Sequence, residues 1–197
     1  MVHTEGMAAW DAVLLAGGAG RRLGTIDKPA ITIRGRTLLD TAIAACAAGR
    51  TIVVVGPRRP TSHPVRWTRE RPPGAGPLAA LGAGLHTLGS GGSGVVVVLA
   101  ADLPAVLPDT VTDLIAAASA DGVDGAVAID RAGRQQPLLA AYRRPALDWA
   151  LAGLGDPRDR AFRDLLAYLR LAPVDVADAA DDIDTTADLR RWQEGEQ

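Results

Sequence analysis

The chain has 197 residues, of which 48% are hydrophobic and 22% are charged, and its net charge is −2. This length predicts one domain with a sizeable core, and the charge balance excludes a general nucleic-acid-binding protein. The longest apolar runs fall far short of the ~20 residues of a membrane span, and a single cysteine with no recognisable signal peptide predicts a cytoplasmic protein without internal disulfides.

The first half of the chain alternates between predicted strands and helices. Short apolar or β-branched runs predict strands at 12–16, 51–55 and 65–69, the last at an edge of the sheet, and a short strand or hairpin arm at 30–33. Helical signals cover 37–48 and 78–88, and loops are expected at 17–28, 56–64 and 72–77. Thr37 is a candidate cap for the first of these helices.

The second half continues this alternation. The run 95–101 has no polar alternation, which is typical of a strand buried on both faces. The remaining predicted elements are a helix at 110–120, strands at 125–129 and 138–142 around a turn at 132–133, helices at 145–154 and 160–169, a strand at 172–176 and a helix at 187–192. Together they predict an α/β fold with a mostly parallel sheet covered by helices on both sides.

In such a sheet, ligands bind beyond the carboxyl ends of the strands. Three segments are predicted to meet there: the loop after Ala16, the loop after Ala101 and the turn after Ile183. Each of them carries glycine or charged residues, so we treat all three as parts of one candidate site.

The loop after Ala16 combines glycines with cations: Gly17, Gly18, Gly20, Arg21, Arg22 and Lys28, the only lysine of the chain. Glycines can take positive φ and bring backbone N–H groups close to an anion, so the pattern suits a polyphosphate. A P-loop is excluded because Pro29 follows the lysine, and the dinucleotide fingerprint fails because Leu23 stands where its third glycine belongs. A flexible turn with solvated arginines is the alternative interpretation.

Carboxylates occupy the other two segments. Asp102 directly follows the buried run, where it is a candidate Mg²⁺ ligand, with capping or loop solvation as the alternative. Asp182 and Asp184 are expected on one side of an extended segment with Ile183 buried, although a solvated acidic stretch is an equal alternative. Thr185 or the threonine after it is a candidate cap for the last helix.

Five motifs in order resemble the MobA-like nucleotidyltransferase family over nearly the whole chain. They are Leu15-Ala-Gly-Gly-Ala-Gly-Arg-Arg-Leu-Gly-Thr-Ile-Asp-Lys28, Glu70-Arg-Pro-Pro-Gly-Ala-Gly-Pro-Leu-Ala79, Ala101-Asp-Leu-Pro104, Arg134-Gln-Gln-Pro-Leu-Leu-Ala-Ala-Tyr-Arg143 and Asp182-Ile-Asp-Thr-Thr-Ala-Asp-Leu189. The resemblance implies a Rossmann-like three-layer sandwich of the nucleotidyltransferase type, with an N-terminal extension at 1–9 and the transferase domain at 10–193. The motifs are most similar to the branch that transfers GMP from GTP to molybdenum-molybdopterin and releases pyrophosphate.

The resemblance also implies roles for individual residues. Catalysis would involve Lys28, Asp102 and Arg22, and the metal, Mg²⁺, would bind Asp102 and Asp184. The nucleotide-binding residues would be Leu15, Ala16, Gly17, Gly18, Gly20, Lys28, Glu70, Gly76, Pro77, Leu78 and Asp102. Implied partners are GTP, the pterin acceptor and proteins among molybdoenzymes or the cofactor pathway, with no nucleic acid and no membrane.

Departures from the family pattern keep alternatives open. Glu70 replaces a frequent Asp, Gly56 and the two residues after it stand where Asn is frequent, and Asp182 and Asp184 stand where guanylyltransferases often carry Asn. The alternatives are a cytidylyltransferase acting on molybdopterin, an NTP transferase acting on another phosphate monoester and a non-catalytic nucleotide-binding module. A dehydrogenase is disfavoured because no acidic residue ends the second strand.

Two remaining features concern single residue types. Cys46 lies on a predicted helix face, where we expect it to be buried and unreactive. The arginines of the segment 58–71 are interpreted as a solvated cationic face, with contact to an acidic partner or the acceptor phosphate as the alternative: Arg58, Arg59, Arg66, Arg69 and Arg71.

Overall fold

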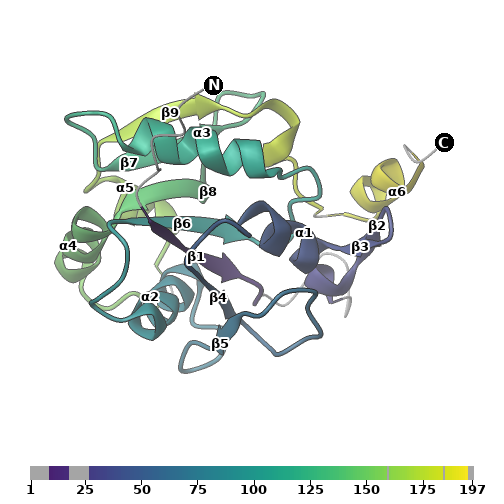
Figure 1. The fold of residues 1–197 in the computed structure, drawn as a ribbon, viewed down its shortest axis with the longest axis horizontal. Helices are drawn as coiled ribbons and strands as arrows, with labels where there is room; N and C mark the ends of the chain where they lie inside the picture. The colour runs from purple at the N-terminus through teal and green to yellow at the C-terminus, as the bar shows by residue number, and fades with distance from the viewer. Residues whose placement is uncertain (1–8, 18–26, 159, 184, 195–197) are drawn as a thin grey trace, which may run out of the picture.

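A central sheet of seven strands organises the molecule (Figure 1). The computed structural model describes residues 9–17, 27–158, 160–183 and 185–194. In order across the sheet, the strands are β5 (Arg66–Thr68), β4 (Thr51–Val55), β1 (Trp10–Leu15), β6 (Val95–Ala100), β8 (Gln135–Arg143), β7 (Gly125–Ile129) and β9 (Leu171–Asp175). The short β5, predicted as an edge strand, and β9 form the two edges.

The sheet is mostly parallel, as the sequence predicts, and β8 is its one reversed strand among the described residues. This strand pairs antiparallel with β6 on one side and with β7 on the other. The turn that reverses it places Gly133 at φ +76°, and the N–H of this glycine donates to the Asp130 carbonyl at 2.9 Å. The sequence predicts this turn but not the insertion of β8 between β6 and β7, which is a tertiary pairing.

Helices cover both faces of the sheet (Figure 1). One face carries α1 (Leu38–Ala45) and α3 (Pro108–Ala118), and the other carries α2 (Pro77–Leu88), α4 (Arg144–Leu154) and α5 (Phe162–Leu166). Alternate residues of β1 supply the two cores, with Leu14 packed in the α1–α3 cluster and Val13 in the α2–α4 cluster. This double burial explains the uniformly apolar strands.

The segment after the glycine-rich loop forms the predicted hairpin arm, which begins later than expected. A 3₁₀ turn η1 (Lys28–Ala30) comes first, because Pro29 favours a helical first turn. A hairpin of β2 (Thr32–Ile33) and β3 (Arg36–Thr37) follows. The side chain of Thr37 then accepts a hydrogen bond from the Asp40 N–H at 3.0 Å, so the predicted cap of α1 is confirmed.

Several predicted helices change their bounds, and for two of them the cause is local chemistry. The predicted helix at 110–120 begins instead at Pro108, whose fixed φ suits a first helical turn. The predicted helix at 160–169 shortens to α5, because the backbone N–H of Arg170 donates to Asp124 at 2.9 Å and draws the chain into β9.

The C-terminal segment returns to the carboxyl end of the sheet. After η2 (Ala177–Ala180), helix α6 (Thr186–Glu194) lies beside the β2–β3 hairpin (Figure 1). Thr185 caps it, since its Oγ1 accepts from the Asp188 N–H at 3.1 Å. Ile183 is fully buried with Ile33 and Leu38, which fixes this segment in place. Across the part of the chain described here, every helix is too short or too polar to cross a bilayer.

Candidate functional site

The carboxyl ends of β1, β4 and β6 form the floor of the candidate site. The Ala16 N–H donates to the Val55 carbonyl at 2.9 Å, and the Ala101 N–H donates to the Leu15 carbonyl at 3.0 Å. Gly56 has φ +152°, and a Cβ at this position would lie 2.7 Å from the carbonyl carbon and oxygen of Ala16. Only glycine therefore allows the chain after β4 to pass so close to the start of the glycine-rich loop.

Lys28 and Asp102 meet above this floor. Lys28 begins η1, and Asp102 follows β6 by two residues. The Lys28 Nζ lies 3.8 Å from Asp102 Oδ2, and the two side chains are 15% and 25% exposed. The structure thus brings together the cation and the carboxylate that the sequence singles out, at an edge where both can reach a ligand.

Glu70 lies beside the start of the glycine-rich loop. A Cβ at Gly17 would be 3.9 Å from Glu70 Oε1, and the Gly74 N–H donates to that oxygen at 2.8 Å. The residue is only 7% exposed, and its Oε2 is buried without a hydrogen-bond partner among the residues that the structure describes. A buried carboxylate oxygen with no donor is costly, so this atom is suited to accept a hydrogen bond from a ligand.

The turn that follows leads into α2. Gly76 precedes the helix at φ +93°, a conformation that favours glycine, and Pro77 is its first residue. Leu78 is fully buried in the core between α2 and the sheet. Of these three predicted nucleotide-binding residues, Gly76 and Pro77 therefore lie on the surface side of the turn, while the Leu78 side chain packs inward.

The last acidic motif also reaches the site. The Ile183 N–H donates to the Asp102 carbonyl at 3.3 Å, which brings Asp182 to the same edge of the sheet. Four of the predicted site residues lie outside the described part of the chain, so their roles stay predictions: Gly18, Gly20, Arg22 and Asp184.

Arg59 is not predicted from the sequence to be a residue of the site. Its side chain is only 12% exposed and is paired with Asp27, so the interpretation as part of a solvated face is wrong for this residue. The hydrogen bonds from the Arg59 guanidinium lower the pKa of Asp27 and keep its carboxylate charged. Nothing local in the sequence indicates this pairing, because Arg59 and Asp27 are 32 positions apart.

The donor set limits which metal could bind. Within the described residues, no group of three or more His, Cys, Asp and Glu side chains could hold a metal ion. Mg²⁺ does not require such a cage, because it takes one or two carboxylates together with phosphate oxygens of a substrate. The partly exposed carboxylate of Asp102 fits that requirement.

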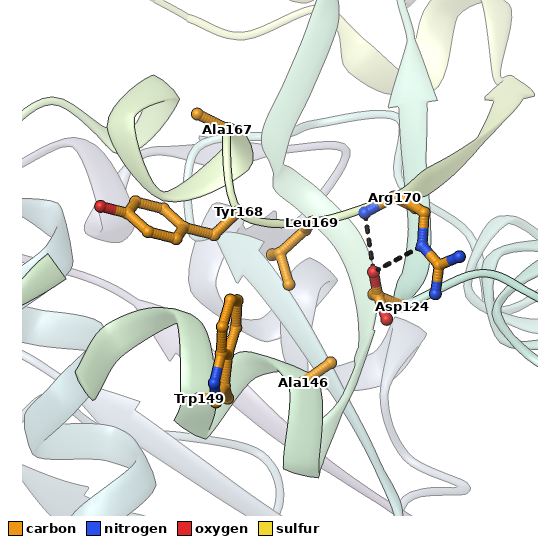
Figure 2. Close-up of a pocket in the computed structure, with 7 residues that line it drawn as sticks. All are labelled: Asp124, Ala146, Trp149, Ala167, Tyr168, Leu169 and Arg170. Carbon is orange, nitrogen blue, oxygen red and sulfur yellow. Dashed lines mark hydrogen bonds and ion pairs between the residues drawn. The ribbon is translucent and has the colours of Figure 1, made fainter. Parts of the chain in front are cut away.

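A separate hollow of about 530 Å³ lies at the opposite, amino edge of the parallel strands. Figure 2 shows Trp149 and Tyr168 facing each other there, with the Asp124–Arg170 ion pair beside them. The centroids of the two rings are 6.1 Å apart, and the rings pack edge to face. None of the candidate site residues lines this hollow, so the site described above does not depend on it.

Comparison with known proteins gives a consistent result. The family model of the MobA-like NTP transferase domain matches residues 12–174. The chain is 33% identical to a molybdenum cofactor guanylyltransferase of Acidiphilium cryptum (strain JF-5), over 93% of this chain and 94% of the relative. It is also 33% identical to a probable molybdenum cofactor guanylyltransferase of Mycobacterium tuberculosis (strain H37Rv), over 83% of each chain.

Solved structures show the same fold. The molybdopterin-guanine dinucleotide biosynthesis protein A from Archaeoglobus fulgidus matches with a TM-score of 0.71 at 23% identity, over 93% of this chain and 97% of that one. A 2-C-methyl-D-erythritol 4-phosphate cytidylyltransferase from Thermus thermophilus matches with a TM-score of 0.66 at 20% identity, over 92% and 96%. At these identities the likeness concerns the fold alone.

Proposed function

Since this chain belongs to the MobA-like NTP transferase family, we propose that it transfers GMP from GTP to the phosphate of molybdenum-molybdopterin. An oxygen of the acceptor phosphate bonds to the α-phosphorus of GTP, the α–β phosphoanhydride bond breaks, and pyrophosphate leaves. The observation that carries the proposal is the meeting of Lys28 and Asp102 at the carboxyl edge, within motifs shared with guanylyltransferases. We place the reaction in the cytoplasm.

The reaction brings one anion to attack another, so the site must lower the repulsion between them. The Lys28 ammonium group stabilises the negative charge that develops on the α-phosphate and on the leaving pyrophosphate. Asp102 would hold Mg²⁺, which when bound supplies Lewis-acid activation of the phosphate oxygens. No side chain has to remove a proton from the acceptor, because a phosphate monoester is already ionised near pH 7.

The nucleotide itself is proposed to lie along the start of the glycine-rich loop. Backbone groups of Ala16 and Gly17 border that space, and Glu70 Oε2 has no donor in the described part of the chain. A hydroxyl or amino group of the nucleotide that donates to this oxygen would satisfy it. Binding without such a donor would leave the buried carboxylate uncompensated, so Glu70 favours ligands that present one.

The test is thermal unfolding with Mg²⁺ and either GTP, CTP, ATP or NAD, followed by an assay for pyrophosphate release with the molybdopterin acceptor. GTP at 100 times its dissociation constant should stabilise the protein by ~2.7 kcal/mol. Mg²⁺-dependent pyrophosphate release with GTP supports the proposal. A shift and release with CTP instead would contradict the choice of base, and GTP binding without any product would indicate a binding module.

A further inference from the structure

Arg59 joins both ends of the glycine-rich loop through one guanidinium group. Its Nε and Nη2 donate to the two carboxylate oxygens of Asp27 at 2.8 and 2.5 Å. Its Nη1 donates to the carbonyls of Ala16 at 3.2 Å and Pro57 at 2.9 Å. Ala16 immediately precedes the loop glycines and Asp27 immediately precedes Lys28, so a single side chain contacts the described residues on both sides of the loop.

The geometry suits orientation more than global stability. A guanidinium presents its donors as a rigid planar fork, which a carboxylate matches with two parallel hydrogen bonds. Asp27 is 51% exposed, and half-exposed ion pairs add little to the free energy of unfolding. The fork nevertheless fixes both the distance and the direction of Asp27 relative to the end of β1.

The constraint continues from Asp27 into the turn that carries Lys28. The Ala30 N–H donates to the Asp27 carbonyl at 2.9 Å, and the Ile31 N–H donates to the Lys28 carbonyl at 3.0 Å. Because η1 is only one turn long and Asp27 is its N-cap residue, the position of Asp27 determines the position of the Lys28 backbone.

We infer that Arg59 is a positioning residue, which holds Asp27 against the end of β1 and thereby directs Lys28 toward the nucleotide phosphates. This inference rests on the proposed function for its catalytic consequence, but the contact itself is independent of it. A displacement of about 1 Å at a reacting group can reduce turnover by up to about 10²-fold. Loss of the fork should therefore act on kcat more than on the KM for GTP.

The first experiment compares turnover of Arg59→Ala with that of a matched control. Arg144→Ala is the control. Like Arg59, Arg144 has a mostly buried side chain (15% exposed) that pairs with a half-exposed aspartate, Asp148, and donates to a backbone carbonyl, that of Gly89, at 3.1 Å. Arg144 lies at the amino edge of the parallel strands, far from Lys28. We expect kcat to fall about tenfold or more for Arg59→Ala, and to change less than twofold for Arg144→Ala. Equal turnover of both variants would overturn the inference.

Three further variants separate the effect of the planar guanidinium from the effect of its charge. Arg59→Lys keeps the charge but loses the planar fork, so it should retain most of the defect. Asp27→Asn removes the carboxylate, and the double variant Arg59→Ala/Asp27→Asn should be no worse than Arg59→Ala alone. Added ethylguanidinium should restore part of the turnover of Arg59→Ala. Full activity of Arg59→Lys, or additive losses in the double variant, would contradict the inference.

Hydrogen exchange tests whether Arg59 holds the Asp27–Ile31 backbone in place, without any catalytic readout. In Arg59→Ala, the amides of Ala30 and Ile31 should exchange faster, while in Arg144→Ala they should keep the wild-type rate. If the wild-type protein releases no pyrophosphate, the proposed function fails and the exchange result still decides the contact. Unchanged exchange in Arg59→Ala would overturn the inference even in an active enzyme.

Discussion

The Lys28 Nζ and Asp102 Oδ2 atoms lie 3.8 Å apart, and we expect each residue to be required for turnover. Lys28→Ala and Asp102→Ala should each lower kcat by on the order of 10²-fold or more, because each removes a charge that stabilises the transition state. Steady-state pyrophosphate release measures the effect. Asp109→Ala, at an exposed position on α3, is the control and should keep wild-type turnover. A folded Lys28→Ala protein with near-normal kcat would exclude the lysine from catalysis.

Asp11 is a fully buried carboxylate near the amino end of the central strand β1. Burial alone would raise its pKa, but hydrogen bonds from Arg50 at 2.8 and 3.1 Å and from the Ser93 N–H at 2.7 Å together lower the pKa. A carboxylate with a lowered pKa in the folded state stabilises the fold above the unfolded pKa of about 4, and that contribution disappears as the pH falls through the folded pKa.

Asp11→Asn should therefore lower the free energy of unfolding at pH 7 by about 2–3 kcal/mol, less than for a fully buried pair because Arg50 is 46% exposed. The difference from the wild type should shrink as the pH falls below about 4. Urea denaturation at pH 7 and at a series of acidic pH values measures it. The exposed Asp113→Asn should change stability by no more than about 0.5 kcal/mol at any pH. A pH-independent loss would contradict the charge argument.

At the residue scale, sequence reasoning found the charged pair of the site because both residues stand out locally. Lys28 is the only lysine, and Asp102 directly follows an apolar run. Arg59 could not be found in the same way, since a loop rich in proline and arginine is normally solvated. Its burial depends on Asp27, 32 positions away in sequence, and such a contact exists only in the folded chain.

At the scale of elements, α2 shows how helix packing decides the effect of one methyl group. A Cβ at Gly84 would lie 2.5 Å from Val13 Cγ1, whereas a Cβ at Gly82 would have nothing within 4 Å. Gly84→Ala should destabilise the fold by about 1–3 kcal/mol through overpacking. Gly82→Ala should stabilise it by about 0.5–1 kcal/mol, because alanine favours a helix interior.

Chemical denaturation of the two alanine variants measures this difference, and each serves as the control for the other. They share the helix, the residue type and the substitution, so the main difference is the contact with Val13 of β1 and Val55 of β4. Equal effects on the free energy of unfolding would show that α2 does not approach β1 as closely as described.

The element types are largely predictable because α/β chains alternate strongly in local composition. The parallel strands are apolar throughout, and Thr37 marks a helix start where the structure places one. Bounds and neighbours are less predictable. The insertion of β8 between β6 and β7 depends on hydrogen bonding between β6 and β8, which are far apart in sequence, for which the pairing of Ala140 with Val98 is an example.

At the scale of the whole molecule, Cys46 offers a probe of global unfolding. It is fully buried in the α1–α3 cluster, and burial raises the pKa of its thiol, so little thiolate forms in the native state. We expect thiol reagents to label it only in unfolded molecules. The labelling rate in increasing urea should then follow the unfolding equilibrium measured by circular dichroism. Rapid labelling in native buffer would contradict the burial.

The architecture as a whole follows from the sequence, and the site follows only in part. Strand–helix alternation and apolar runs predict a covered sheet, and ligands at its carboxyl edge are a general property of such sheets. The surroundings of Glu70 could not be predicted, because its buried Oε2 results from how the 70–76 turn folds over Gly17.

The edges of the sheet bear on how the protein behaves in concentrated solution. An exposed strand with free backbone donors invites another chain to extend the sheet, which is a route to aggregation. Here one edge strand, β5, is only three residues long. The other, β9, has Pro173 at its centre, which has no N–H to donate to an added strand. Both edges are thus poor templates for strand addition, so we expect aggregation by extension of the sheet to be disfavoured.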